Sequence, residues 1–418
     1  MMEEEYRFEQ ALRDRIYPNR VAKSVFSRHH PSRTLPGKNA KRERTLSNFD
    51  FIVIGAGIAG ASAAYELQQQ GQTILVEREP LPGHHTTGRS AAFLLDSYVG
   101  AVVGSLTRRS RVFFEEPPAG FTEAPLVTPN AVLWIAREDQ HESLKEATRS
   151  GREAGAELIE IDLKEALAHC PILNQDYVRE TVLEPSALHI DVAGLLESFL
   201  RGFRRRGGIV STRAEVISVR QNGEAWEVEA GGETLHAAIV VNAAGAWSDV
   251  VGSLAGAKPI GLAPLRRTAI TFDGPPGTDT RSWPLVMDAD EDFYFKPEGA
   301  QLLASPCDET PSEPCDTSPE DYDVALVADR VQRATTLELR HIRRRWAGLR
   351  SFVADRSPVI GMDPERHGFF WLAGQGGFGI MTSPAASRAA AGLIVNGRLP
   401  EDLEALGLRP EMLSPSRL

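Results

Sequence analysis

The chain is poor in cysteine and in long apolar runs, and it has no excess of positive charge. Its 418 residues include three cysteines, Cys170, Cys307 and Cys315, with no C-x-x-C pair and no spacing typical of a metal site. Cys307 and Cys315 are near enough in sequence to pair, but reduced thiols fit the composition better. No segment approaches the roughly 18 apolar residues that cross a bilayer, and the net charge of −11 argues against nucleic acid as a partner. We therefore expect a cytoplasmic protein with no transmembrane segment, no metal centre and no nucleic-acid partner.

The first 48 residues differ from the remainder of the chain. Residues 1–50 hold 11 Lys and Arg against seven Asp and Glu, and the stretch 28–48 is polar and contains prolines. The segment has no apolar core of the kind a secretory signal needs, and its acidic opening argues against a mitochondrial transit peptide. We expect residues 1–48 to form a flexible extension.

A strand, a glycine-rich turn and a helix follow one another after residue 50. The apolar run 51–54 leads into Gly55, Gly57 and Gly60, and the next apolar strand ends at Glu77. Gly55 permits a tight turn, Gly57 lets the backbone approach a pyrophosphate, and Gly60 lets the helix pack closely on the strand. The helix N-terminus offers free N–H groups to phosphate, and the acid accepts ribose hydroxyls. This pattern predicts a dinucleotide site without distinguishing FAD from NAD.

Two later segments also run from an apolar strand into small residues and glycine. The first is the stretch 239–247, and the second is 369–379, which precedes a helix of small residues over 383–395. That helix could direct its N-terminus at the same cofactor. Because neither segment repeats the full G-x-G-x-x-G with an acid downstream, the sequence disfavours a reductase with two nucleotide domains.

The remaining patterns predict helices and an antiparallel sheet. A helix is expected over 190–206, capped by Asp191, and a hairpin joins strands 209–219 and 225–230. Residues 262–303 read as mostly antiparallel strands, and the Pro- and Ser-rich stretch 305–321 reads as a loop.

Six motifs, taken in order, resemble the FAD-dependent D-amino acid oxidase/dehydrogenase superfamily, which includes glycine and sarcosine oxidases. They resemble in particular bacterial D-arginine-dehydrogenase-like flavoproteins, and the resemblance covers about residues 49 to 418. The motifs are Gly55–Gly60, Thr86–Ala92, Val241–Trp247, Phe293–Lys296, Trp346–Arg350 and Gln375–Gly379.

The resemblance implies an α/β fold with two domains. A discontinuous Rossmann-like FAD-binding domain would comprise 49–95, 186–262 and 346–418, and an α+β substrate domain built on an antiparallel sheet would comprise 96–185 and 263–345. It also implies non-covalent FAD, since the stretch that carries the linking cysteine in some relatives has none here. The cofactor-binding residues it implies are Gly55, Gly57, Ala59, Gly60, Glu77, Arg78, Thr86, Thr87, Gly88, Arg89, Ser90, Ala91, Ala92, Val216, Ala244, Gly245, Gly376, Gly377, Phe378, Gly379, Ile380 and Met381.

The resemblance also places the substrate. Arg350 and Arg267 occupy the carboxylate-binding positions, where a guanidinium fork suits a carboxylate. Tyr98 and Tyr294 occupy the tyrosine positions, and Gly377 matches a position whose carbonyl faces the substrate amine.

The chain departs from D-arginine dehydrogenases at three positions of the implied substrate pocket. Polar residues there are replaced by Phe93, Leu94 and Met381, and no acid stands where a substrate guanidinium would be bound. An unpartnered buried cation is costly, so we expect D-Arg and D-Lys to be poor substrates and apolar D-amino acids to be better ones.

The implied reaction is oxidative deamination of a D-amino acid. A hydride would pass from Cα to flavin N5, and the imino acid would hydrolyse to a 2-oxo acid and ammonia. The sequence does not identify the electron acceptor. Two alternatives stay open: oxidation of a secondary amine such as sarcosine, proline or an opine-like N-alkyl amino acid, and a flavin-binding accessory protein without turnover.

Overall fold

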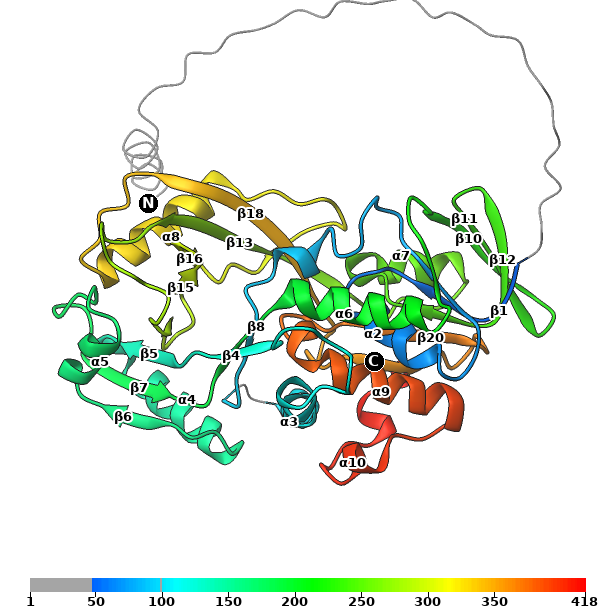
Figure 1. Cartoon of the computed structure of the whole chain (residues 1–418), viewed down its shortest axis with the longest axis horizontal. Coiled ribbons are helices and arrows are strands. Elements are labelled where there is room, and N and C mark those ends of the chain that lie inside the picture. Colours follow the sequence, from blue (N-terminus) through cyan, green and yellow to red (C-terminus); the bar gives the residue numbers. More distant parts are fainter. Residues whose placement is uncertain (1–46, 98–99) are drawn as a thin grey trace, which may run out of the picture.

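The computed structural model describes residues 47–97 and 100–418, so the predicted extension and Tyr98 lie outside the described residues, apart from positions 47 and 48. Two large sheets lie next to each other along the long axis of the molecule (Figure 1). A small sheet of β3 (Phe93–Leu94), β8 (Leu188–Ile190) and β4 (Val127–Pro129) lies between them.

The first sheet is built around β1 (Ser47–Ile54). Four further strands run parallel in it: β2 (Thr73–Val76), β9 (Ile209–Ser211), β12 (Glu233–Asn242) and β20 (Phe369–Ala373). The hairpin of β10 (Val216–Asn222) and β11 (Ala225–Ala230) adds antiparallel to β12, and β19 (Val359–Met362) adds antiparallel to β20.

Apolar side chains cover both faces of the first sheet, which explains the unbroken apolar run in β1. Phe51 and Val53 pack into one core with α2 (Ile58–Leu67), α3 (Ala101–Glu115), α6 (Val192–Arg205) and α9 (Gly379–Asn396). Ile52 and Ile54 point to the opposite core, against α7 (Ser248–Leu254). The short α10 (Glu401–Glu404) lies beside α3.

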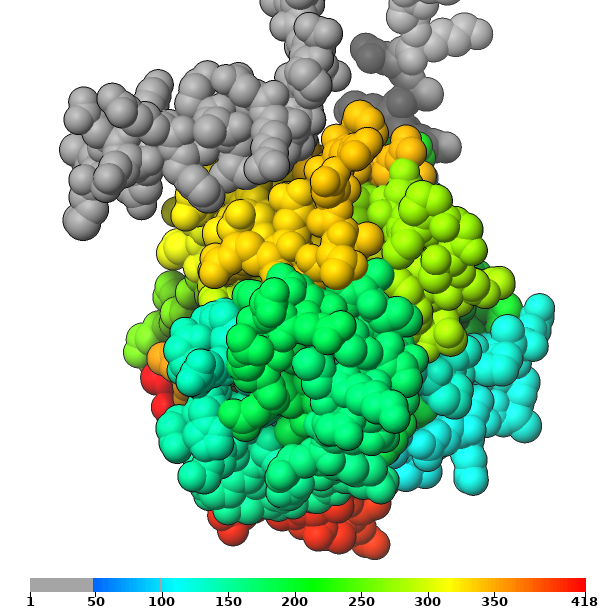
Figure 2. Space-filling model, turned by 90° about the vertical axis from the view of Figure 1, so that its left-hand side faces the viewer, coloured from blue at the N-terminus to red at the C-terminus, as the bar shows by residue number. Residues whose placement is uncertain are grey.

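The second sheet is largely antiparallel. Its strand order is β17 (Thr310–Pro311), β13 (Ala263–Asp273), β16 (Gln301–Ser305), β15 (Tyr294–Glu298), β14 (Leu285–Asp288), β5 (Val132–Ala136), β7 (Glu180–Glu184) and β6 (Ile159–Ile161). The ninth strand, β18 (Ile342–Phe352), pairs with β13. α8 (Asp321–Ala334) and α5 (Leu163–His169) cover one face, and α4 (His141–Glu153) packs near β5. Figure 2 shows this end of the molecule, where residues 320–345 lie above residues 140–190.

The predicted fold class is confirmed, because a Rossmann-like parallel sheet adjoins an α+β unit with a largely antiparallel sheet. Asp191 caps α6 as predicted, since its carboxylate accepts a hydrogen bond from Gly194 N at 2.9 Å. The cysteines are all free thiols. No helix in the described residues is both long and apolar enough to span a bilayer.

Two predicted boundaries differ from the structure. The expected strand 209–219 is split into β9 and β10, because the chain turns at Arg213, whose φ is 55°. The expected start of the last FAD-domain segment, residue 346, falls inside β18, which belongs to the second sheet. β18 therefore belongs to the second sheet, and its residues near 350 line a cleft together with residues of the first sheet.

Candidate functional site

A continuous groove follows the carboxyl ends of β1, β2 and β12. It consists of a first cleft of about 910 Å³ and a second cleft of about 1020 Å³. The two share their walls at Gly57, the η1 turn (Thr86–Arg89) and the β12–η3 junction (η3, Gly245–Trp247). A groove at this edge of a parallel sheet is where such folds bind ligands.

The glycine motif forms the base of the groove. Gly55 has φ of +100°, and a Cβ there would lie 2.5 Å from the carbonyl oxygen of Ala243. A Cβ on Gly60 would lie 1.8 Å from the carbonyl oxygen of Gly55, so α2 approaches the turn as closely as glycine permits. Gly55 and Gly60 therefore have the packing roles that their spacing predicted, and the role of Gly57 beside a pyrophosphate stays a prediction.

Glu77 lies buried at the wall of the first cleft. Its two carboxylate oxygens accept hydrogen bonds from Ala56 N at 2.7 Å and from Glu79 N at 2.9 Å. These bonds fix the carboxylate, and its remaining lone pairs can still accept from hydroxyl groups in the cleft.

The N-terminus of α2 lies where the two clefts meet. Ile58 N donates to Thr87 Oγ1 at 3.0 Å, and Ala59 lines the second cleft. The amides of Ala59 and Gly60 have no acceptor within the helix, because first-turn amides have none. This position is suited to a diphosphate.

A stack of side chains covers part of the first cleft. The Arg78 guanidinium lies 4.4 Å from the centroid of the Trp247 ring, and the His85 ring lies 4.7 Å from it. His85 Nε2 and Arg78 Nε are each 3.0 Å from Glu79 Oε1. Burial lowers the pKa of His85, so the neutral imidazole is favoured.

The η1 turn is attached to the second sheet. Thr86 Oγ1 donates to Leu349 O at 2.8 Å, Arg89 Nη1 donates to Ala347 O at 2.9 Å, and Trp346 Nε1 donates to Arg89 O at 3.1 Å. Asp316 forms an ion pair with Arg89. These bonds hold η1 against β18 between the two sheets.

The second cleft is lined by three of the predicted substrate-site side chains, which stand on strands of the second sheet. They are Arg267 of β13, Tyr294 of β15 and Arg350 of β18. Burial raises the pKa of Tyr294, and the positive charges of Arg350 and Arg267 partly oppose that rise. The phenol therefore stays protonated at neutral pH.

The two arginines differ in their partners. The Arg350 guanidinium has no hydrogen bond or ion pair with any residue that the structure describes, and it packs on Gly377, where a Cβ would lie 2.9 Å from Nη1. Arg267 donates from Nε to Asp308 O at 2.8 Å and from Nη2 to Glu309 Oε1 at 3.3 Å.

Two buried polar atoms in the second cleft have no partner among the described residues. They are Ser351 Oγ and Gln375 Nε2. Unsatisfied buried polar atoms indicate a missing hydrogen-bonding ligand. A long groove with a fixed acid at one end, helix amides in the middle and orphan polar atoms at the other end fits an extended FAD.

Most of the predicted cofactor residues line this groove. Four do not: Gly60, Gly88, Phe378 and Met381. Sequence reasoning missed His85, Trp247, Ser351 and Gln375. Of these, Trp247 and Gln375 stand at the ends of glycine motifs, which is the only sequence signal that could have identified them.

Three residues that were predicted to shape the substrate pocket are absent from the cleft lining. Phe93 packs edge-on against His189 at 5.4 Å in an apolar cluster near Tyr294. Leu94 and Met381 are buried in the helical core under the first sheet. The cleft lining therefore gives no support to a pocket role for these side chains.

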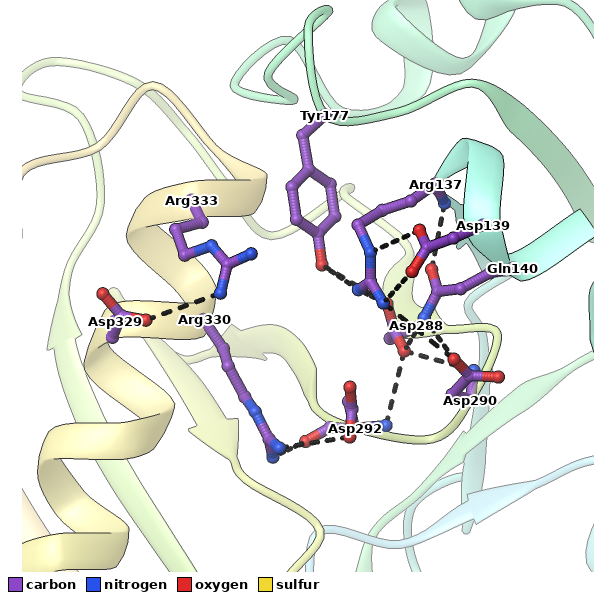
Figure 3. Close-up of polar contacts among 10 residues, drawn as sticks. All are labelled: Arg137, Asp139, Gln140, Tyr177, Asp288, Asp290, Asp292, Asp329, Arg330 and Arg333. Atoms are coloured by element: carbon purple, nitrogen blue, oxygen red, sulfur yellow. Dashed lines mark hydrogen bonds and ion pairs between the residues drawn. The ribbon is translucent and has the colours of Figure 1, made fainter. Parts of the chain in front are cut away.

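A separate group of carboxylates lies beyond the cleft, at Asp288, Asp290 and Asp292 (Figure 3). Gln140 Nε2 donates to Asp288 and Asp290 at 2.8 Å, and Arg330 Nη2 donates to Asp292 at 3.1 Å. The oxygens are satisfied by amides and cations, so the group is explained as a turn that joins β14 to β15.

The sequence matches a family model described as FAD dependent oxidoreductase (DAO) over residues 50–393. Mitochondrial sarcosine dehydrogenase of Homo sapiens is 28% identical over 405 residues, which cover 91% of this chain and 42% of that protein. The chain thus spans less than half the length of this relative.

Solved structures share the fold. L-proline dehydrogenase from P. horikoshii superimposes with a TM-score of 0.77 at 20% identity, covering 89% of this chain and 98% of that one. Glycine oxidase from Geobacillus kaustophilus gives 0.75 at 20% identity, covering 83% and 95%. With the groove described above and the match over residues 50–393, these findings show that the chain belongs to the DAO family of FAD-dependent oxidoreductases.

Proposed function

We propose that this protein oxidises the amine of an amino acid. The observation that carries the proposal is the Arg350 guanidinium, which lines the second cleft beside Tyr294 and has no partner among the described residues. A half-buried guanidinium in a cleft that fits a redox cofactor is suited to a substrate carboxylate. The similarity to proteins named for sarcosine, proline and glycine supports the same substrate class.

FAD, when bound, supplies an acceptor for the two electrons of the carbon–nitrogen bond oxidation. Arg350 would hold the carboxylate by a two-pronged hydrogen bond, and the protonated phenol of Tyr294 would donate a further one. These contacts orient the carbon that bears the nitrogen. Glu77, Arg78 and Val216, which line the first cleft, would hold the adenosine end of the cofactor.

The second cleft has no acid or imidazole among its described lining residues. A general base is therefore missing from the part of the wall that the structure describes, whereas three guanidinium groups are present, those of Arg89, Arg267 and Arg350. Positive charge nearby disfavours an ammonium ion and favours the neutral amine. The site thereby promotes loss of the amine proton, which must precede transfer of a hydride from the adjacent carbon.

Two substrate classes fit this site. A D-amino acid is the first, and its apolar side chain stays a prediction from the sequence. A secondary amine, such as an N-alkyl amino acid, is the second, and the names of the sarcosine and proline enzymes favour it.

The test is anaerobic bleaching of the bound flavin by D-amino acids, L-amino acids and N-alkyl amino acids. Reduction of the flavin by a D-amino acid but not by its L enantiomer would assign a D-amino acid as the substrate. Reduction by an N-alkyl amino acid but not by the corresponding primary amine would assign a secondary amine. If none of these amines bleaches the flavin, amine oxidation is wrong and a non-catalytic flavin-binding role takes its place.

A further inference from the structure

Arg267 and Arg350 lie on the same face of the second sheet. β13 and β18 run side by side (Figure 1), and their register pairs Arg267 with Gly348 and Leu265 with Arg350. Arg267 is two residues from Leu265, so the two arginines are diagonal neighbours on one face. Arg266 points to the other face, where it pairs with Asp323 at 2.9 Å.

Like charges at neighbouring positions of a sheet destabilise it unless anions compensate. Among the described residues, Glu309 is the carboxylate paired with Arg267, and it also pairs with Arg356 at 2.8 Å. The Asp308 carboxylate is not bonded to Arg267, since it accepts from Thr268 N at 2.6 Å and from Thr268 Oγ1 at 2.9 Å and lies 3.9 Å from Arg266 Nε. Two guanidinium groups thus share the Glu309 carboxylate, and the Arg350 guanidinium has no carboxylate partner among the described residues.

Arg267 keeps donors free for a ligand. Its Nε and one Nη2 hydrogen are used by Asp308 O and Glu309, but Nη1 has no partner among the described residues. The same side chain lines the second cleft. The bonds to Asp308 and Glu309 therefore hold Arg267 in place and leave its remaining N–H groups available there.

The charge of the cleft favours a substrate with more than one anionic group. An amino acid with one carboxylate brings a single negative charge once its amine is neutral, and Arg350 can hold that carboxylate alone. A second carboxylate would meet Arg267, which lies a diagonal step away on the same face. Resting on the proposed amine oxidation, and in place of the apolar side chain predicted from the sequence, we infer that the substrate is a short dicarboxylic amino acid, with one carboxylate on Arg350 and the other on Arg267.

Matched compounds that differ only in the second charge test this inference. With anaerobic holoenzyme, D-glutamate is compared with D-glutamine, D-aspartate with D-asparagine, and iminodiacetate with its monoamide. Because charged hydrogen bonds are the stronger ones, a dicarboxylate should reduce the flavin about 10- to 100-fold more efficiently than its neutral counterpart in at least one pair.

Variants assign the preference to Arg267. R267Q should bring the ratio within each pair close to one, and R267K should restore part of it. As a control, R343Q removes an arginine charge from an exposed position of β18, seven residues before Arg350, where Arg343 pairs with Asp273. This change should leave the ratio unchanged. Equal rates within every pair in the unaltered protein, or a ratio that survives R267Q, would overturn the inference.

A binding measurement separates this inference from the proposed function. Succinate should perturb the flavin absorbance at lower concentration than its monoamide, succinamate, and R267Q should abolish the difference. If amines bleach the flavin but each dicarboxylate reduces it no faster and binds no better than its amide counterpart, the dicarboxylate inference fails and amine oxidation stands. If no amine bleaches it, amine oxidation fails, and a preference for succinate would still show the paired anion site.

Discussion

The two ends of the groove are built in opposite ways. In the first cleft the polar groups satisfy one another, since Glu77 is held by two backbone amides, and Arg78 and His85 both bond to Glu79 beside Trp247. In the second cleft Arg350, Ser351 Oγ and Gln375 Nε2 have no partner among the described residues. The first end is complete as it stands, whereas the second has polar groups that a ligand must satisfy. Changes at the second end should therefore alter catalysis, and changes at the first end should alter cofactor retention.

The largest expected effect follows from removing the unpartnered cation. R350M should lower kcat/KM for the preferred amino acid by about 100- to 1000-fold, because losing one partner of a desolvated charge pair costs about 3–4 kcal/mol. R350K should recover part of the loss, and R343M on the same strand should change little. Steady-state kinetics with flavin content as a control measures this. A loss of flavin from R350M, with normal kcat/KM per bound flavin, would mean that Arg350 belongs to the cofactor site.

A smaller effect is expected from crowding the same cation. G377A would place a Cβ 2.9–3.2 Å from the Arg350 guanidinium, whose flexible end must shift by a few tenths of an ångström. Because a displaced guanidinium loses its two-pronged geometry, KM should rise about tenfold and kcat should fall less. The G377A/R350M double variant should be no worse than R350M alone. Additive losses would show that Gly377 acts through something other than Arg350.

At the first end, the expected loss is in cofactor affinity. W247A removes the ring that Arg78 and His85 both contact, and a cation–π contact of this kind contributes about 1–2 kcal/mol when partly buried. The dissociation constant of FAD, measured by flavin fluorescence, should rise about tenfold, and W247F should retain most of the affinity. The value of kcat at saturating FAD should stay the same. A fall in kcat with unchanged affinity would erase the distinction between the two clefts.

At both ends of the groove the sequence predicted local features better than contacts between distant segments, for a physical reason. The turn at Gly55 and the close packing at Gly60 follow from the local spacing of the glycines, and the position of Glu77 follows from the length of β2. Trp247 and His85, in contrast, come together only through the fold, from segments far apart in sequence. Phe93, Leu94 and Met381 show the converse, because apolar residues next to site motifs pack into cores as readily as into pockets. The diagonal placement of Arg267 and Arg350 depends on the register of β13 and β18, which no local pattern specifies.

The smallest expected effect is a change in the pH profile. The neutral amine is the reactive form, so kcat/KM should rise with pH and level off near the pKa of the free substrate amine. Guanidinium charge in the second cleft disfavours the ammonium form, so the midpoint for kcat should lie about one pH unit below that for kcat/KM. Burial raises the pKa of Tyr294 above its ordinary value, so its proton is lost only at higher pH and should cause no descending limb below about pH 10. R267Q should move the kcat midpoint back toward that of the free amine, since it removes one of the three guanidinium groups that line the cleft, whereas R343Q should not. A bell-shaped profile whose upper limb lies below pH 9 and disappears in Y294F would show instead that the phenol ionises in the working range and that the second cleft does contain an acid–base group.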